Sequence, residues 1–184
     1  MTKQVFTFLL FIMLTLGIAA PLQAASAAAD TLVPELEVFR PFLNKVWRGE
    51  LTAQQPGKTS IDHSLWQRAL NGTAIKVIHS VNDGEYGGES IIFWDKSKQS
   101  LAYYYFTTAG FYTHGTMQYD KVSQSLVAEE KVENNKNGIT MVRSVSHLKA
   151  NQLTTSSEYL QHGKWVKGHA ATYVETKEGK VRFL

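Results

Sequence analysis

Between residues 45 and 174 the sequence alternates short runs of β-branched and aromatic residues with clusters of Gly, Asn, Asp and Lys, and no apolar run there has helical spacing. Parallel strands need long crossover connections, usually helices, so this chain is restricted to antiparallel hairpins. We expect about ten strands, at residues 46–52, 60–70, 74–81, 91–94, 101–106, 111–119, 126–132, 140–148, 153–160 and 165–174. Closure of such a meander removes its two exposed edges. The predicted fold class is all-β, an antiparallel up-and-down barrel of about eight to ten strands.

A short helix is expected ahead of the first strand. Pro34 is acceptable in a first helical turn, and Pro41 limits how far a regular helix can run. The apolar residues that recur at helical spacing are Leu32, Leu36, Phe39 and Leu43. The pattern predicts a short N-terminal helix that acts as a lid.

The first residues have the pattern of an export signal. Lys3 precedes an apolar run at residues 5–20, and small residues follow it. The cleavage site stays open within residues 24–29. The predicted localisation is periplasmic or secreted, and the mature chain is expected to have no transmembrane anchor. The predicted segments are a signal peptide at 1–24, a flexible leader at 25–31 and a single lipocalin-like barrel domain at 32–184.

The composition excludes several function classes. A chain of 184 residues with 43% hydrophobic residues is long enough for one core and short for two domains. It contains no cysteine, which excludes disulfides, thiolate metal sites and cysteine nucleophiles. The net charge of +3 is small and scattered, so we expect no nucleic-acid partner. No nucleophile elbow, phosphate loop or dinucleotide fingerprint occurs, and the oligomeric state stays open.

The first predicted strand carries a short motif, because residues 45–49 read Lys-Val-Trp-Arg-Gly. A short helix, a strand with Trp47 and an antiparallel meander together resemble the calycin group of lipocalins, fatty-acid-binding proteins and nitrobindin-like barrels, including small exported bacterial proteins. In those families Gly-x-Trp, often Gly-x-Trp-x-Gly, starts the first strand. Here Trp47 and Gly49 match the element, and Lys45 replaces its first glycine. The resemblance implies structural roles for Gly49 and for Trp47, which would plug one end of the barrel. It also implies that the barrel binds a small molecule inside.

The Tyr-rich block at residues 103–115 is the leading candidate for a ligand wall. Strand alternation places Tyr103 and Tyr105 on one face, and Tyr104 and Phe106 on the other. Inward phenols offer an apolar ring and a hydrogen-bonding tip, while the outward pair is expected to form an exposed cross-strand aromatic ladder. The candidate ligand-binding residues are Tyr103, Tyr105, His114, Arg143 and His79.

Arg143 is the candidate cation of this set. It shares a strand face with Met141 and Val145, so we expect it to be buried. A buried arginine either pairs with a carboxylate such as Glu129 or clamps an anionic head group of a ligand. Both alternatives stay open.

The histidines give no metal motif, because none of the six has the His-x-His or His-x-x-x-His spacing of a metal site. Convergence of His63, His79 and His147 inside the barrel stays an alternative. No metal or other cofactor is predicted. The resemblance to nitrobindin-like barrels implies haem through a late histidine, here His169, as an alternative. Strand alternation puts His169 on the face of Lys167, and the opposite face is predicted to be the core side.

The predicted function is binding of a small, partly apolar molecule by a periplasmic barrel, without catalysis and with that small molecule as its partner. One alternative is an enzyme, such as an isomerase or cyclase, that uses a histidine with a glutamate or tyrosine as acid and base. Another is a structural envelope domain with a filled core. A hollow interior lined by tyrosine and apolar residues favours the binder, and additional converging histidine and carboxylate groups with perturbed pKa values favour the enzyme. A structural domain is expected to show neither feature.

Overall fold

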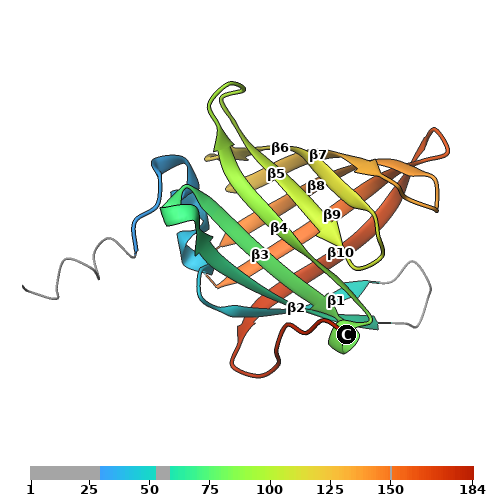
Figure 1. Cartoon of the computed structure of the whole chain (residues 1–184), viewed down its shortest axis with the longest axis horizontal. Helices are drawn as coiled ribbons and strands as arrows, with labels where there is room; N and C mark the ends of the chain where they lie inside the picture. Colours follow the sequence, from blue (N-terminus) through green and yellow to red (C-terminus); the bar gives the residue numbers. More distant parts are fainter. Residues whose placement is uncertain (1–29, 53–58, 150) are drawn as a thin grey trace, which may run out of the picture.

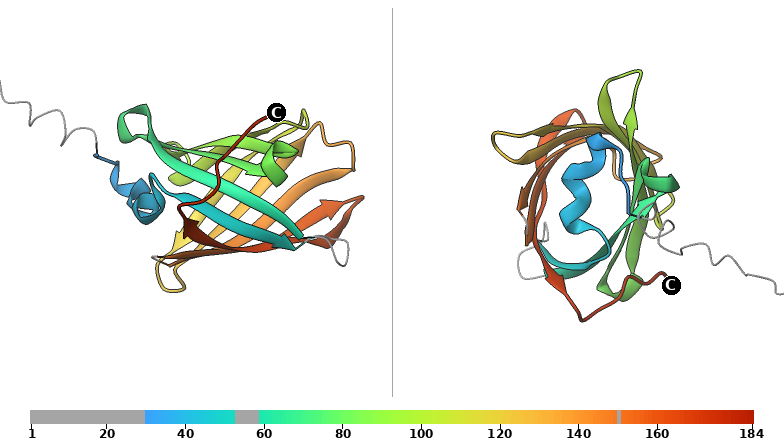
Figure 2. Two further views of the ribbon diagram at one scale, coloured as in Figure 1. Left: turned by 90° about the horizontal axis from the view of Figure 1, so that it is seen from below. Right: turned by 90° about the vertical axis from the view of Figure 1, so that its left-hand side faces the viewer.

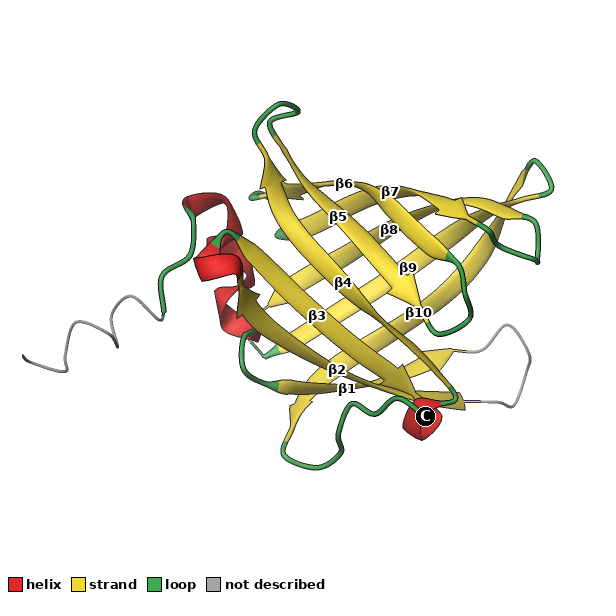
Figure 3. Cartoon of the chain, viewed as in Figure 1, coloured by secondary structure: helices red, strands yellow, loops and turns green. Residues whose placement is uncertain are grey.

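A computed structural model describes residues 30–52, 59–149 and 151–184. In these ranges ten antiparallel strands pair in chain order, and β1 pairs with β10, so that the sheet closes into a barrel (Figures 1 and 3). The predicted up-and-down barrel is confirmed. The strands are β1 (Val46–Thr52), β2 (Thr59–Ala69), β3 (Ala74–Val81), β4 (Tyr86–Asp95), β5 (Ser100–Thr107), β6 (Tyr112–Asp120), β7 (Ser125–Glu133), β8 (Ile139–Lys149), β9 (Gln152–Gln161) and β10 (Lys164–Thr176). The predicted signal peptide and most of the leader lie outside the described residues.

Strand β4 is longer than predicted, because the glycines before residue 91 belong to the strand and not to the preceding turn. A Cβ atom on Gly88 would meet the ring of Tyr105, and one on Gly87 would meet the carbonyl oxygen of His79. These two glycines therefore allow close contact on both faces of the sheet. The turn itself is the single-turn helix η3 (Asn82–Gly84), and another such turn, η2 (Leu70–Gly72), joins β2 to β3.

The predicted N-terminal helix is present as the 3-10 helix η1 (Pro34–Phe42), which lies across one end of the barrel (Figure 2). Its residues Leu36, Phe39 and Phe42 are buried. The backbone N–H of Val33 donates to the carbonyl oxygen of Gly72 at 3.0 Å, which ties the helix to the β2–β3 connection. No helix in the described ranges is both long and apolar enough to cross a membrane.

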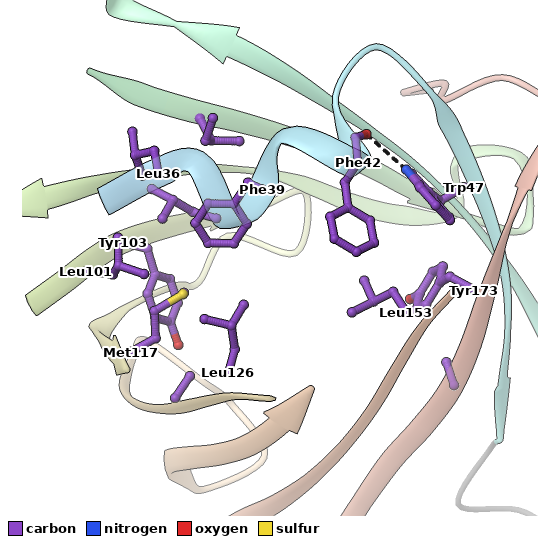
Figure 4. Close-up of a cluster of buried hydrophobic side chains, with 14 residues drawn as sticks. Leu36, Phe39, Phe42, Trp47, Leu101, Tyr103, Met117, Leu126, Leu153 and Tyr173 are labelled. Atoms are coloured by element: carbon purple, nitrogen blue, oxygen red, sulfur yellow. Dashed lines mark hydrogen bonds between the residues drawn. The ribbon is translucent and has the colours of Figure 1, made fainter. Parts of the chain in front are cut away.

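Trp47 and the apolar residues of η1 form one sealed layer (Figure 4). The Trp47 side chain is fully buried, its indole N–H donates to the carbonyl oxygen of Phe42 at 3.0 Å, and the two rings lie 5.0 Å apart. Opposite them lie Leu101, Met117 and Leu126 from the far wall. The interior next to η1 is therefore a mainly apolar core, which also includes the rings of Tyr103 and Tyr173 (Figure 4).

Candidate functional site

A continuous chain of hydrogen bonds crosses the polar half of the interior. The hydroxyl of Tyr173 donates to Asp62 at 2.8 Å, and Nδ1 of His79 lies 2.9 Å from the other carboxylate oxygen. Nε2 of His79 lies 2.7 Å from the hydroxyl of Tyr105, which lies 2.8 Å from the hydroxyl of Tyr86. These side chains come from β10, β2, β3, β5 and β4, so five strands converge on one polar network.

The proton positions along this chain of hydrogen bonds follow from Asp62, the acceptor at its end. Asp62 is buried, and an ionised carboxylate only accepts, so Nδ1 of His79 carries the proton shared with it. Nε2 of a neutral His79 then accepts from Tyr105, and Tyr105 accepts from Tyr86. Burial raises the pKa of Tyr105 and of Tyr173, which keeps both phenols protonated. A second proton on His79 reverses the chain and turns Tyr86 into a free donor.

A second polar group lies around Glu130 of β7. The hydroxyl of Thr113 donates to Glu130 at 2.5 Å, and Tyr103 also hydrogen-bonds to it. Burial raises the pKa of Glu130, so desolvation favours its neutral form. The Glu130 charge also acts on Tyr86, Tyr105 and Tyr159, so this carboxyl lies near the His79 network.

His169 of β10 also faces the interior. Its Nδ1 hydrogen-bonds to the hydroxyl of Tyr159, and Ser157 donates to its backbone carbonyl oxygen. Burial lowers the pKa of His169 and favours the neutral imidazole. The charges of Asp62 and His79 act on this ring, so all these groups belong to one site.

Three of the tyrosine rings lie over glycines of neighbouring strands. A Cβ atom on Gly49 would come within 2.6 Å of the Tyr173 ring, and one on Gly168 within 2.9 Å of the Tyr159 ring. Gly88 is covered in the same way by Tyr105. Because a missing side chain lets each ring lie against the barrel wall, these glycines fix where the rings sit. Tyr105 and Tyr159 stay partly exposed, whereas Tyr173 is buried.

Several inward side chains of this half are not fully covered by protein. Ser144 and Thr155 face inward, because their cross-strand partners Ala128 and Ala171 are buried core residues. Both polar residues nevertheless stay only partly covered, as do Tyr105, Glu130 and Tyr159, whereas Asp62, Thr113 and Ser157 are buried. At the η1 end, in contrast, the interior side chains are almost completely buried. The polar half lies toward the barrel end opposite η1, where the described residues form hairpin turns (Figure 2).

A groove of about 990 Å³ lies outside this lumen, beside η1. Its lining includes Pro34, Val38, Trp94, Met117 and Tyr119, and it contains none of the hydrogen-bonded tyrosines, histidines or carboxylates described above. We therefore place the candidate site in the lumen, where the titratable groups converge.

Three of the five predicted ligand residues lie in the lumen. They are Tyr103, Tyr105 and His79. His114 instead lies on the outer face, where its ring stacks on Tyr104 at 5.7 Å and on Tyr112 at 6.2 Å. The predicted outer aromatic ladder therefore includes this histidine, which is turned away from the lumen.

The prediction that Arg143 is a buried cation is wrong. Its side chain is 49% exposed on the outer face, its guanidinium stacks 3.7 Å from the Trp165 ring centroid, and it pairs with Glu158 and not with Glu129. The face shared with Val145 is the outer one, since Val145 is 37% exposed. The prediction failed because the solvent side of β8 also carries apolar residues such as Val145, which made this face resemble an inner one.

The predicted orientation of β10 is also wrong near His169. A bulge between Lys167 and Ala170 shifts the register against β9. Beyond it His169 and Tyr173 face inward, while Lys167 and Val174 are exposed. Strand alternation cannot be continued across a bulge, because the extra residue changes which face the following side chains occupy.

The sequence analysis missed most of the network. Asp62, Tyr86, Glu130, Tyr159 and Tyr173 were not among the candidates. The signal that could have found Asp62 is strand alternation, because Asp62 shares a face of β2 with Ser64 and both residues are buried. That signal identifies a polar inner face only once the direction of each strand is known.

The histidines do not form a metal site in the described residues. His63 lies against Gly179 of the C-terminal segment, and His147 is exposed, so neither joins His79. No group of three metal-ligating side chains occurs in this part of the chain. For haem, His169 supplies an imidazole whose Nδ1 is anchored by Tyr159. The ring is surrounded by polar groups and not by the apolar slot that a macrocycle requires, so the site does not fit haem.

The comparisons with known proteins bear on the fold. No protein-family model and no curated protein sequence matches this chain. Among solved structures, the crystal structure of Rv2717c from M. tuberculosis aligns with a TM-score of 0.64 and 12% identity, over 80% of this chain and 100% of that one. The S-type phycobiliprotein lyase CPES from Guillardia theta aligns at 0.48 and 14% identity, over 84% and 98%. The chain thus has a calycin-like barrel fold, similar to that of Rv2717c.

Proposed function

We propose that this protein binds a small, partly apolar molecule in the polar half of its barrel lumen. The observation that carries the proposal is the hydrogen-bond chain from Asp62 through His79 to Tyr105, which lines a space that protein side chains leave partly open. A buried polar group that lacks a partner costs about 1–3 kcal/mol. A structural domain with a filled core has no need of so many polar groups in its interior, whereas a ligand site uses them for recognition.

Tyr105→Phe tests the proposal with N-phenyl-1-naphthylamine, an uncharged fluorescent probe with one N–H donor. Removing the hydroxyl breaks the link between His79 and Tyr86 and takes away an acceptor in the lumen. We expect binding to weaken by about 0.5–1.5 kcal/mol in a fluorescence titration.

The matched control is Tyr104→Phe, because the adjacent Tyr104 is 45% exposed on the outer face. We expect it to leave the titration unchanged. Equal affinities for the wild type and both variants, or no binding by the wild type, would contradict the assignment of the lumen as the binding site.

Acid–base catalysis is a second candidate function, favoured by one specific observation. Asp62 orients His79 through Nδ1, and a phenol lies at Nε2, which is the arrangement of an oriented base with a proton donor. In such an enzyme Tyr86 or Tyr105 would pass a proton to a bound substrate while a doubly protonated His79 donates its Nε2 proton to Tyr105 and becomes neutral. Retained probe binding together with lost turnover in His79→Gln would distinguish this function from binding alone.

We also propose that the chain is exported to the periplasm after cleavage of its N-terminal segment. Support comes from Lys3, the apolar run at 5–20 and the small residues that follow it. Sequencing the N-terminus of protein from the soluble envelope fraction is expected to start between Ala25 and Asp30. An intact Met1 in that fraction would show that the segment is not a cleaved signal.

A further inference from the structure

We propose that the lumen selects a small organic cation, such as a substituted ammonium ion, over anions and over neutral molecules of the same shape. This inference rests on the proposed function and names the ligand class of the same site. It follows from three properties of the polar half of the lumen: the sign of its charges, the orientation of its aromatic rings, and a carboxyl group without a cationic partner.

The charges in this half are acidic. Asp62 and Glu130 both face the interior. The described lysines and arginines of the strands lie elsewhere: Lys76 pairs with Glu89 outside, Arg143 stacks outside on Trp165, and Arg68 contacts Thr31 at the η1 end. An anionic ligand would meet two carboxyl groups and no lysine or arginine among the described residues of this half, so its burial is opposed.

The rings favour positive charge. Tyr105 and Tyr159 are only partly covered, and each lies over a glycine of a neighbouring strand. The face of an aromatic ring is the negative part of its quadrupole, and several such faces around one space form the cage that binds substituted ammonium groups. A neutral ligand of equal size gains the same contact area without this attraction.

Glu130 supplies the counter-ion. Asp62 already receives hydrogen bonds from Tyr173 and His79, whereas the partners of Glu130 among the described residues are the neutral hydroxyls of Thr113 and Tyr103. A cation beside Glu130 stabilises the ionised carboxylate that burial disfavours. Binding is therefore coupled to loss of the Glu130 proton.

The titratable groups around Glu130 fix the sign of the pH dependence. The facing groups are Tyr86 of β4, Tyr103 and Tyr105 of β5, and Tyr159 of β9, with His79, His169 and Asp62 in the same network and His114 acting from the outer face. The tyrosines stay neutral, because burial raises their pKa. Protonation of Glu130 or of His169 at low pH disfavours a cation, so cation affinity rises with pH.

The test uses three probes of one shape and different charge: choline, 3,3-dimethylbutan-1-ol and 3,3-dimethylbutanoate. Choline keeps its charge at every pH, so its titration reports the protein alone. By isothermal calorimetry on the full barrel we expect choline to bind about tenfold more tightly than the alcohol, and the carboxylate to show no binding. Choline affinity is expected to increase from about pH 5 to pH 8, roughly the range in which a carboxyl group with a raised pKa and histidines lose their protons.

The decisive variant is Glu130→Gln, which keeps the shape and the acceptor for Thr113 but removes the ionisable group. We expect choline affinity to fall about tenfold and alcohol affinity to stay unchanged. Glu129→Gln is the matched control, since Glu129 is the preceding residue of β7 and is exposed on the outer face. It should bind choline as the wild type does. Any pH dependence that remains in Glu130→Gln belongs to the histidines.

The outcomes separate this inference from the proposed function. Equal or tighter binding of the alcohol or the carboxylate overturns cation selectivity while lumen binding stands. Binding of N-phenyl-1-naphthylamine with no binding of the three matched probes also overturns it. Failure of all four probes overturns both proposals. If Glu130→Gln leaves choline binding unchanged, Glu130 is not the counter-ion and the inference is overturned.

Discussion

Trp47→Ala is expected to lower the free energy of unfolding by about 3–5 kcal/mol, the cost of emptying a large aromatic site in a core. The Trp47 side chain of β1 is fully buried beside Phe42 of η1, and its indole N–H donates to the carbonyl oxygen of Phe42. Its removal leaves a cavity under η1 and an unpaired carbonyl oxygen, so the seal at this barrel end is lost. Denaturant unfolding followed by circular dichroism measures the change.

Trp165→Ala is the control for this substitution. Trp165 lies on the outer face, where it stacks with Arg143, and an exposed cation–π contact contributes only about 0.5–1 kcal/mol. A similar loss of stability in the two variants would show that Trp47 does not have the packing role assigned to it.

Asp62→Ala is expected to cost about 3 kcal/mol, because it leaves two buried donors, Nδ1–H of His79 and the hydroxyl of Tyr173, without an acceptor. Without Asp62 the His79 proton is no longer held on Nδ1, so Nε2 is no longer fixed as the acceptor for Tyr105. We therefore expect weaker probe binding in the lumen together with the lower stability.

A double-mutant cycle with Tyr173→Phe isolates the bond between the two residues. In the wild type, Tyr173→Phe removes a donor from a buried carboxylate, whereas in Asp62→Ala it removes an unpaired hydroxyl. The second change should cost less than the first or even stabilise the barrel. Strict additivity of the two losses would rule out direct coupling between Asp62 and Tyr173.

The sequence alone determined the fold class, because alternation of apolar and polar residues between turn clusters needs no knowledge of distant contacts. It also placed Tyr103 and Tyr105 on a common face, since β5 pairs with β4 and β6 without a bulge and the two-residue period holds along it. The helix η1 followed from apolar spacing around Pro34 and Pro41. These features are local, and local patterns specify them.

Only the tertiary structure decided which strand faces form the lumen and which residues meet there. In β8 both faces carry residues that suit an interior, so the exposure of Arg143 and Val145 depends on the neighbouring strands. In β10 the bulge before Ala170 reverses the alternation and turns His169 inward. Tyr173 reaches Asp62 across 111 residues because β1, between their strands, closes the barrel by pairing with β10 on one side and β2 on the other. Pairing between segments so distant is set by closure of the whole sheet, and no local pattern encodes it.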